Sequence, residues 1–165
     1  MMERKQNLTK EFNWKLIIRY KVIIEERTED APFIGALISA IDCKFNCKNC
    51  FNQHLKNIKT QQKDSDIIIQ EIKQNPFNKG IILAGLEWSN QSEEAKILIE
   101  TAIKNNLQVI LYTGMDIKNF KIKYPELMIH GIYLKYGKYE ENQKTINHIG
   151  YGVTLASFNQ HIIKI

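Results

Sequence analysis

The chain has no apolar run long enough to cross a bilayer. Its longest nearly apolar stretch extends from Phe33 to Ile41, whereas a membrane-spanning helix needs roughly 20 residues. The first ten residues are polar and lack the apolar core of an export signal. Repeats and low-complexity segments are also missing. We therefore expect a cytoplasmic protein with no membrane partner, in a compartment that keeps thiols reduced.

Cysteine is scarce, and its placement is informative. All three cysteines lie in the run Cys43-Lys44-Phe45-Asn46-Cys47-Lys48-Asn49-Cys50, with the spacing C-x3-C-x2-C. No fourth cysteine is left to complete a four-thiolate site. A 4Fe–4S cluster with three cysteine ligands keeps one iron open to a substrate or cofactor. The spacing therefore favours chemistry at an open iron.

Three other interpretations of this run stay open. His54 follows Cys50 with three residues between, so the four side chains match a Cys3His zinc site. The other two are a disulfide with a spare thiol and three unrelated buried thiols. The zinc interpretation predicts a non-enzymatic module that binds nucleic acid through its lysines. The net charge is +5, but the lysines are scattered, which is typical of a solvated surface, and nucleic acid is not the partner we expect.

The pattern along the chain predicts one α/β domain over residues 1–165, with 1–12 as a flexible N-terminal segment. Helices alternate with buried strands, which indicates βα units and a mainly parallel sheet. We expect an open partial (β/α) barrel of about five or six mainly parallel strands, because a full barrel needs ~250 residues. The expected strands cover 33–41, 79–84, 107–112, 127–134, 153–156 and 161–165, and 14–25 is expected to form a strand or a hairpin arm. Helices are expected after Ser65, after an Asn90–Glu93 capping pair and near Ile117.

A second signal follows the strand at 79–84, in Gly85-Leu86-Glu87-Trp88. A glycine lets the backbone approach a ligand closely, and a carboxylate can pair with an ammonium group. Ligands of such folds bind at the carboxyl ends of the strands. The cysteine run follows the strand at 33–41, so both signals belong to the same edge of the sheet.

Together these features resemble the radical S-adenosylmethionine superfamily, whose three cysteines hold the cluster and whose Gly-Gly-Glu segment receives the amino group of S-adenosylmethionine. Within it, the chain is similar to the activating enzyme of anaerobic (class III) ribonucleotide reductase. Leu86, Trp88 and His161 depart from that family's usual residues. The resemblance to the activase rests on Cys50-Phe51-Asn52, Leu111-Tyr112-Thr113-Gly114, Tyr136-Gly137-Lys138-Tyr139 and Ser157-Phe158-Asn159-Gln160-His161.

The resemblance implies an oxidoreductase that cleaves S-adenosylmethionine to methionine and a 5′-deoxyadenosyl radical. That radical would generate a glycyl radical on a large reductase subunit, with an electron donor such as a flavodoxin or ferredoxin. A radical enzyme acting on another substrate is the neighbouring alternative. The implied metal ligands are Cys43, Cys47 and Cys50, and the implied cofactor-binding residues are Asn49, Phe51, Gly85, Glu87 and Thr113.

Four further side chains carry expectations that a structure can test. We expect Phe51 to pack beneath the cysteine loop and His54 to be an ordinary loop residue. Trp88 is expected to be half-buried at the end of its strand, with a partner anchor as the alternative. Lys135 is expected to be solvated, with a carboxylate clamp as the alternative.

Overall fold

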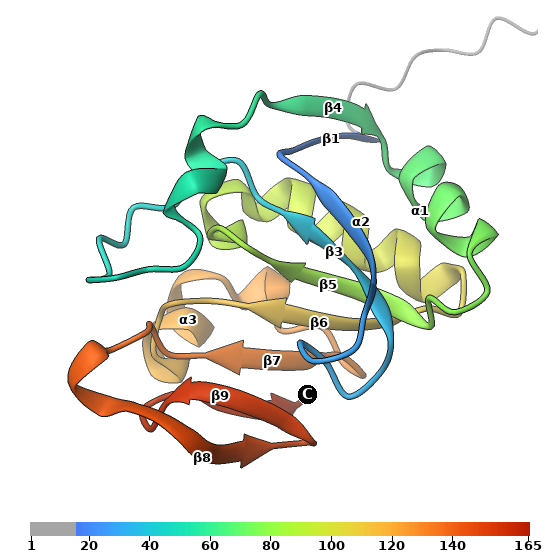
Figure 1. Cartoon of the computed structure of the whole chain (residues 1–165). Coiled ribbons are helices and arrows are strands. Elements are labelled where there is room, and N and C mark those ends of the chain that lie inside the picture. Colours follow the sequence, from blue (N-terminus) through green and yellow to red (C-terminus); the bar gives the residue numbers. More distant parts are fainter. Residues whose placement is uncertain (1–15) are drawn as a thin grey trace, which may run out of the picture.

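The computed structural model describes residues 16–165, and the predicted flexible segment 1–12 lies outside this range. Within it the chain is a mixed α/β structure (Figure 1). No helix of this range is both long and apolar enough to span a membrane. The strands are β1 Ile17–Tyr20, β2 Ile23–Arg27, β3 Gly35–Ser39, β4 Gln61–Asp64, β5 Gly80–Ala84, β6 Gln108–Tyr112, β7 Tyr133–Tyr136, β8 Lys144–Gly150, β9 Val153–Ser157 and β10 His161–Lys164, and the helices are α1 Ser65–Gln74, α2 Ser92–Lys104 and α3 Ile117–Lys123.

A six-stranded sheet organises the molecule, in the order β10-β7-β6-β5-β3-β2. The four inner strands β3, β5, β6 and β7 are parallel, and the edge strands β2 and β10 pair antiparallel. Two further pairs, β1 with β4 and β8 with β9, form separate two-stranded sheets. The closure of the central sheet into a partial barrel stays a prediction.

The two faces of the sheet are covered differently. Side chains alternate along a strand, so Ile81 and Leu83 of β5 join the core beneath α1, α2 and α3. Ile82 and Ala84 point to the other face, where Val153 of β9 helps to cover them. Burial on both faces explains why β5 is a continuous apolar run. Figure 1 shows the helices on one side of the sheet and the hairpin of β8 and β9 near its lower edge.

The helix starts differ from those expected. The Asp64 side chain caps α1 by accepting from the Asp66 N–H at 2.8 Å, and Ser65 is buried as the first helical residue. The predicted Asn90–Glu93 capping pair is wrong, because a 3-10 turn precedes α2 and the helix begins at Ser92 without a side-chain cap. Gln91 occupies the cap position, but its amide is engaged with the backbone of Arg19 and Ile41.

The strand predictions need correction at three places, one of which is β8, a strand that was not predicted from the sequence. The stretch 127–134 forms strand only from Tyr133, because Pro125–Leu127 makes a 3-10 turn. Leu127 and Ile132 are apolar because they are buried in the core, not because they lie in a strand. The polar segment Gln61–Asp64 was not predicted, yet it pairs with β1. Its backbone hydrogen bonds, rather than apolar alternation, define it as a strand.

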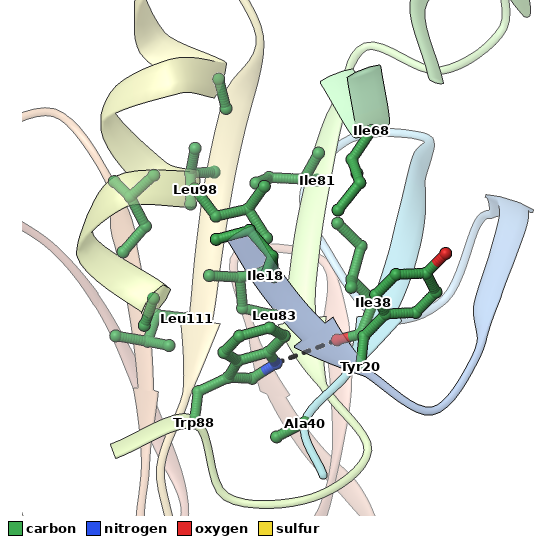
Figure 2. Packing of buried hydrophobic residues seen from close by; sticks show 14 of the residues in the cluster. Ile18, Tyr20, Ile38, Ala40, Ile68, Ile81, Leu83, Trp88, Leu98 and Leu111 are labelled. Carbon is green, nitrogen blue, oxygen red and sulfur yellow. Dashed lines mark hydrogen bonds between the residues drawn. The ribbon is translucent and has the colours of Figure 1, made fainter. Parts of the chain in front are cut away.

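Trp88 lies in the middle of the core rather than at the surface (Figure 2). Its side chain is 0% exposed, and its Nε1–H donates to the Ile38 carbonyl at 2.9 Å. Figure 2 shows the indole beside Leu83 and Ala40. The expectation of a half-buried aromatic or a partner anchor is therefore wrong. The indole instead joins the segment after β5 to β3, next to the start of the cysteine loop.

Candidate functional site

The cysteine loop extends from the end of β3 past the carboxyl ends of β5, β6 and β7 (Figure 1). Its three thiols are free and partly buried, while Lys44 and Lys48 between them are exposed. A turn with a hydrogen bond from the Cys50 N–H to the Cys47 carbonyl, at 3.2 Å, brings the last two cysteines together. Asn49 has a φ of 56° in this turn, a left-handed conformation that asparagine tolerates better than most residues.

All three cysteines line one cavity of ≈ 140 Å³. The rest of its wall comes from the ends of the parallel strands, as expected for ligand sites of this class of sheet. The main contributors are Gly85 and Glu87 after β5, Thr113 and Gly114 after β6, and Lys135 and Gly137 on and after β7.

The spacing of the three thiols distinguishes a site for one metal ion from a site for an iron–sulfur cluster. Among residues 16–165, no three His, Cys, Asp or Glu side chains lie close enough to share one metal ion. His54 is exposed and is not part of the cavity wall. The ligands of one zinc ion lie about 2.3 Å from it, whereas the thiolates of a 4Fe–4S cluster bind different irons and stand farther apart. Three thiols around one cavity fit the second arrangement.

Glu87 is the one carboxylate among the residues that line the thiols' cavity. It is 4% exposed, and its Oε2 accepts from the Gly114 N–H at 2.7 Å. Its Oε1 accepts from the Ser89 hydroxyl at 2.7 Å and from the Ser89 N–H at 3.3 Å. None of the ion pairs in the described part of the chain includes Glu87. A carboxylate offers about four acceptor positions, so this buried charge retains capacity for a cationic ligand group.

Two glycines determine how closely the loop and the strand ends approach. Gly85 has a φ of +83°, and a Cβ there would lie 2.8 Å from the Ser39 hydroxyl. A Cβ on Gly114 would lie 2.8 Å from the Phe45 ring. Phe45 therefore packs directly on the end of β6, and only glycine leaves room for it. The sequence suggested that Gly85 made room for a ligand, but the structure shows that it also makes room for Ser39.

The structure brings only one of the other three predicted cofactor-binding residues to the cavity wall. Thr113 lines the cavity and is 5% exposed, with its hydroxyl oxygen accepting from the Met115 N–H at 3.1 Å. Asn49 and Phe51 are not part of this wall. Phe51 is 65% exposed, with its ring centroid 5.5 Å from that of Tyr139. The expectation that Phe51 packs beneath the loop is therefore wrong.

Several cavity residues were not among the predicted metal or cofactor ligands. Asn52, Tyr112, Lys135, Lys138 and Gln160 all face the thiols' cavity. Tyr112, Lys138, Asn52 and Gln160 lie within the four matching segments, so the resemblance could have identified them. Lys135 lies just before one of these segments; it was expected from the sequence to be solvated, whereas the structure places it in the cavity wall.

Burial and the nearby lysines act on the pKa of two of the thiols in opposite directions. Burial raises the pKa of the Cys43 and Cys47 thiols above their ordinary value. Glu87 adds to the rise in the pKa of Cys43, whereas Lys56 opposes it there and Lys138 opposes it at Cys47. Thiolates are the form that binds iron, and the metal itself favours their deprotonation. The two lysines also offset part of the negative charge that three thiolates bring.

Comparison with known proteins gives one clear relationship. No curated protein matches the sequence. The model of the 4Fe-4S single cluster domain family matches residues 35–163. The match begins at the first residue of β3 and ends within β10, so it includes the cysteine loop and all four parallel strands. Together with three thiols around one cavity, this identifies an iron–sulfur protein. The chain belongs to the 4Fe-4S single cluster domain family.

Proposed function

We propose that the protein is a radical S-adenosylmethionine activase that generates a glycyl radical on anaerobic ribonucleotide reductase. One observation carries the proposal above all: three thiols and a buried carboxylate, Glu87, line the same cavity. Three cysteine ligands leave one iron of a 4Fe–4S cluster without a protein ligand. S-adenosylmethionine has an amino acid group that can chelate that iron and an ammonium that a carboxylate can pair with.

The residues have separate tasks in this proposal. Cys43, Cys47 and Cys50 hold the cluster, and Glu87 receives the ammonium. Thr113 borders the same cavity and retains its hydroxyl proton as a donor. With one electron from a reduced donor protein, bound S-adenosylmethionine supplies methionine and a 5′-deoxyadenosyl radical, which takes a hydrogen atom from a glycine Cα. The protein holds the cluster and S-adenosylmethionine in position and excludes water from the cavity.

The proposed partners are large proteins. The reductase would bring its glycine loop to the edge of the sheet where the cysteine loop lies. Phe51 on this loop is exposed, as are Lys44 and Lys48, so this edge offers an aromatic ring and positive charge to another protein. A flavodoxin or ferredoxin would supply the electron. We place this activity in the cytoplasm.

A mixture of reduced protein, S-adenosylmethionine and a class III reductase tests the activase assignment. We expect an EPR doublet near g ≈ 2 that requires the reductase, together with methionine and 5′-deoxyadenosine in the products. Cleavage of S-adenosylmethionine without a doublet on any co-encoded reductase would support membership of the radical S-adenosylmethionine superfamily but reject the activase function. Absence of cleavage in protein that holds its cluster would reject both.

The variant Glu87→Gln tests the proposed ammonium site. A charge-assisted hydrogen bond contributes about 1.5–3 kcal/mol, so we expect roughly a ten- to hundredfold loss of S-adenosylmethionine affinity by anaerobic calorimetry. The amide oxygen still accepts from the Gly114 N–H, so iron content should be unchanged. Glu93→Gln, at an exposed site of α2, is the matched control. Equal affinities of the wild type and Glu87→Gln for S-adenosylmethionine would show that Glu87 has a structural role only.

A further inference from the structure

Four rings from β7, β10, β8 and the turn between β9 and β10 form a row. In order they are Tyr136, His161, His148 and Phe158, and the centroids of successive rings lie 5.6, 5.4 and 5.7 Å apart. None of the four lines the thiols' cavity. The two rings in the middle of the row are imidazoles, which brings two metal-binding side chains together away from the cysteine loop.

His148 is held in one tautomer by a backbone carbonyl. Its Nε2 lies 2.7 Å from the Gln160 carbonyl oxygen, and because a carbonyl can only accept, Nε2 carries the proton. The other nitrogen of the neutral ring, Nδ1, then has a lone pair. Among residues 16–165, Asn159 Oδ1 is the one buried polar side-chain atom without a hydrogen-bond partner, so Nδ1 of His148 is open to solvent. Histidines that bind metals typically donate their other ring N–H to such a carbonyl.

His161 offers the second nitrogen. It is exposed on β10, and its ring plane makes an angle of 85° with that of His148, at a centroid separation of 5.4 Å. An ion bound tetrahedrally to one nitrogen of each imidazole, 2.0–2.1 Å from each, places the ring centroids about 5 Å apart. The two imidazoles therefore stand at the separation that a shared ion requires.

The donor set selects a class of ion. Imidazole nitrogens suit zinc, copper and nickel, whereas magnesium and calcium prefer oxygen ligands. Among residues 16–165, no third His, Cys, Asp or Glu lies close enough to join the pair. Since His161 is exposed, water can complete the coordination of an ion held by two histidines.

We propose that His148 and His161 form a surface site for a divalent transition-metal ion of the imidazole-binding class, bound through Nδ1 of His148 and one ring nitrogen of His161. The β8–β9 hairpin is a separate two-stranded sheet, and a shared ion would join its β8 strand to β10 of the central sheet. The proposal goes beyond the activase function and does not rest on it, because its ligands are histidines outside the thiols' cavity.

Calorimetric titration with Ni²⁺ tests the site on the anaerobically reconstituted full-length protein without an affinity tag. We expect the wild type to bind one ion per chain with no loss of iron. Removing the hydrogen-bond partner behind a ligating histidine typically weakens metal binding about 10–100-fold, so removing a ligand should weaken it at least roughly tenfold.

Two variants separate metal binding from ring packing. His148→Gln keeps an N–H for the Gln160 carbonyl but loses the ring nitrogen with the lone pair. His161→Phe keeps a ring beside His148 but has no nitrogen. We expect both variants to fold and to lose the Ni²⁺ affinity of the wild type. Ni²⁺ should also raise the unfolding temperature of the wild type more than that of either variant, because an ion that binds only the folded state stabilises it.

His130→Gln is the matched control. His130 is exposed like His161, but it lies before β7 and is not part of the row of rings. This variant should keep the wild-type affinity. Equal Ni²⁺ affinity in the wild type and in either His148→Gln or His161→Phe, or binding only with loss of iron, would overturn the proposal. Since the titration requires neither S-adenosylmethionine nor a reductase, its failure is distinguishable from failure of the activase function.

Discussion

Cys47→Ala protein, reconstituted under anaerobic conditions, is expected to lose most of its iron, whereas the wild type should hold close to four irons per chain. Cys47 is the middle cysteine of the C-x3-C-x2-C run, and its thiol borders the same cavity as the other two. Two remaining thiolates cannot hold a cubane firmly against exchange. Iron analysis and the broad absorption band near ~400 nm measure the loss.

His54→Ala is the matched control for this loss. His54 lies in the 3-10 helix Gln53–Asn57, which follows the cysteine run, and it is exposed and not part of the wall of the thiols' cavity. We expect its removal to leave the iron content nearly unchanged. Unchanged iron in Cys47→Ala would reject the ligand assignment. Loss of metal in His54→Ala, with zinc in the wild type, would favour a Cys3His site.

Trp88→Ala is expected to lower the free energy of unfolding by about 3–5 kcal/mol. The indole is 0% exposed, so its removal leaves a large cavity among apolar neighbours. It also leaves the Ile38 carbonyl without the Nε1–H donor that lies at 2.9 Å. Urea unfolding of the full chain, followed by circular dichroism, measures the change.

Trp88→Phe separates the loss of the hydrogen bond from the loss of packing. It can also be measured if the alanine variant does not fold. It keeps most of the ring but loses the hydrogen bond, so we expect a loss of about 1–3 kcal/mol from the unsatisfied carbonyl. Phe77→Ala is the control, because Phe77 is 62% exposed and should change stability little. A loss below about 1 kcal/mol in Trp88→Ala would show that the indole is not a core residue in solution.

The elements that the sequence determined best are those with a strong local pattern. The run Ile81-Ile82-Leu83 indicated a strand covered on both faces, and β5 is buried along its whole length. Ala95, Leu98, Ile99 and Ala102 are spaced at i, i+3, i+4 and i+7, which predicts one apolar face of a helix, and all four are buried on α2. Ile103 is 40% exposed, because helical periodicity gives the direction of the apolar face but not where its edge lies.

The iron–sulfur assignment was equally local. The spacing of Cys43, Cys47 and Cys50 is contained in one loop, so eight residues were enough to suggest the cluster, and the family match bears it out. The roles of the surrounding residues are not local. Glu87 and Gly114 are joined by a hydrogen bond of 2.7 Å across 27 positions of sequence, and this contact exists because β5 and β6 are neighbours.

Only the tertiary structure decided which face each remaining side chain occupies. Trp88 follows a strand and was expected to be half-buried, but the turn after β5 directs its ring into the core. Lys135 looked like an ordinary lysine, yet the position of β7 beside β6 sets its ammonium over Tyr112 and next to the thiols' cavity. Local patterns report hydrogen bonding and burial along one element. Which chemical groups meet depends on strand order and on the layers packed against each face, because these set distances between residues far apart in sequence.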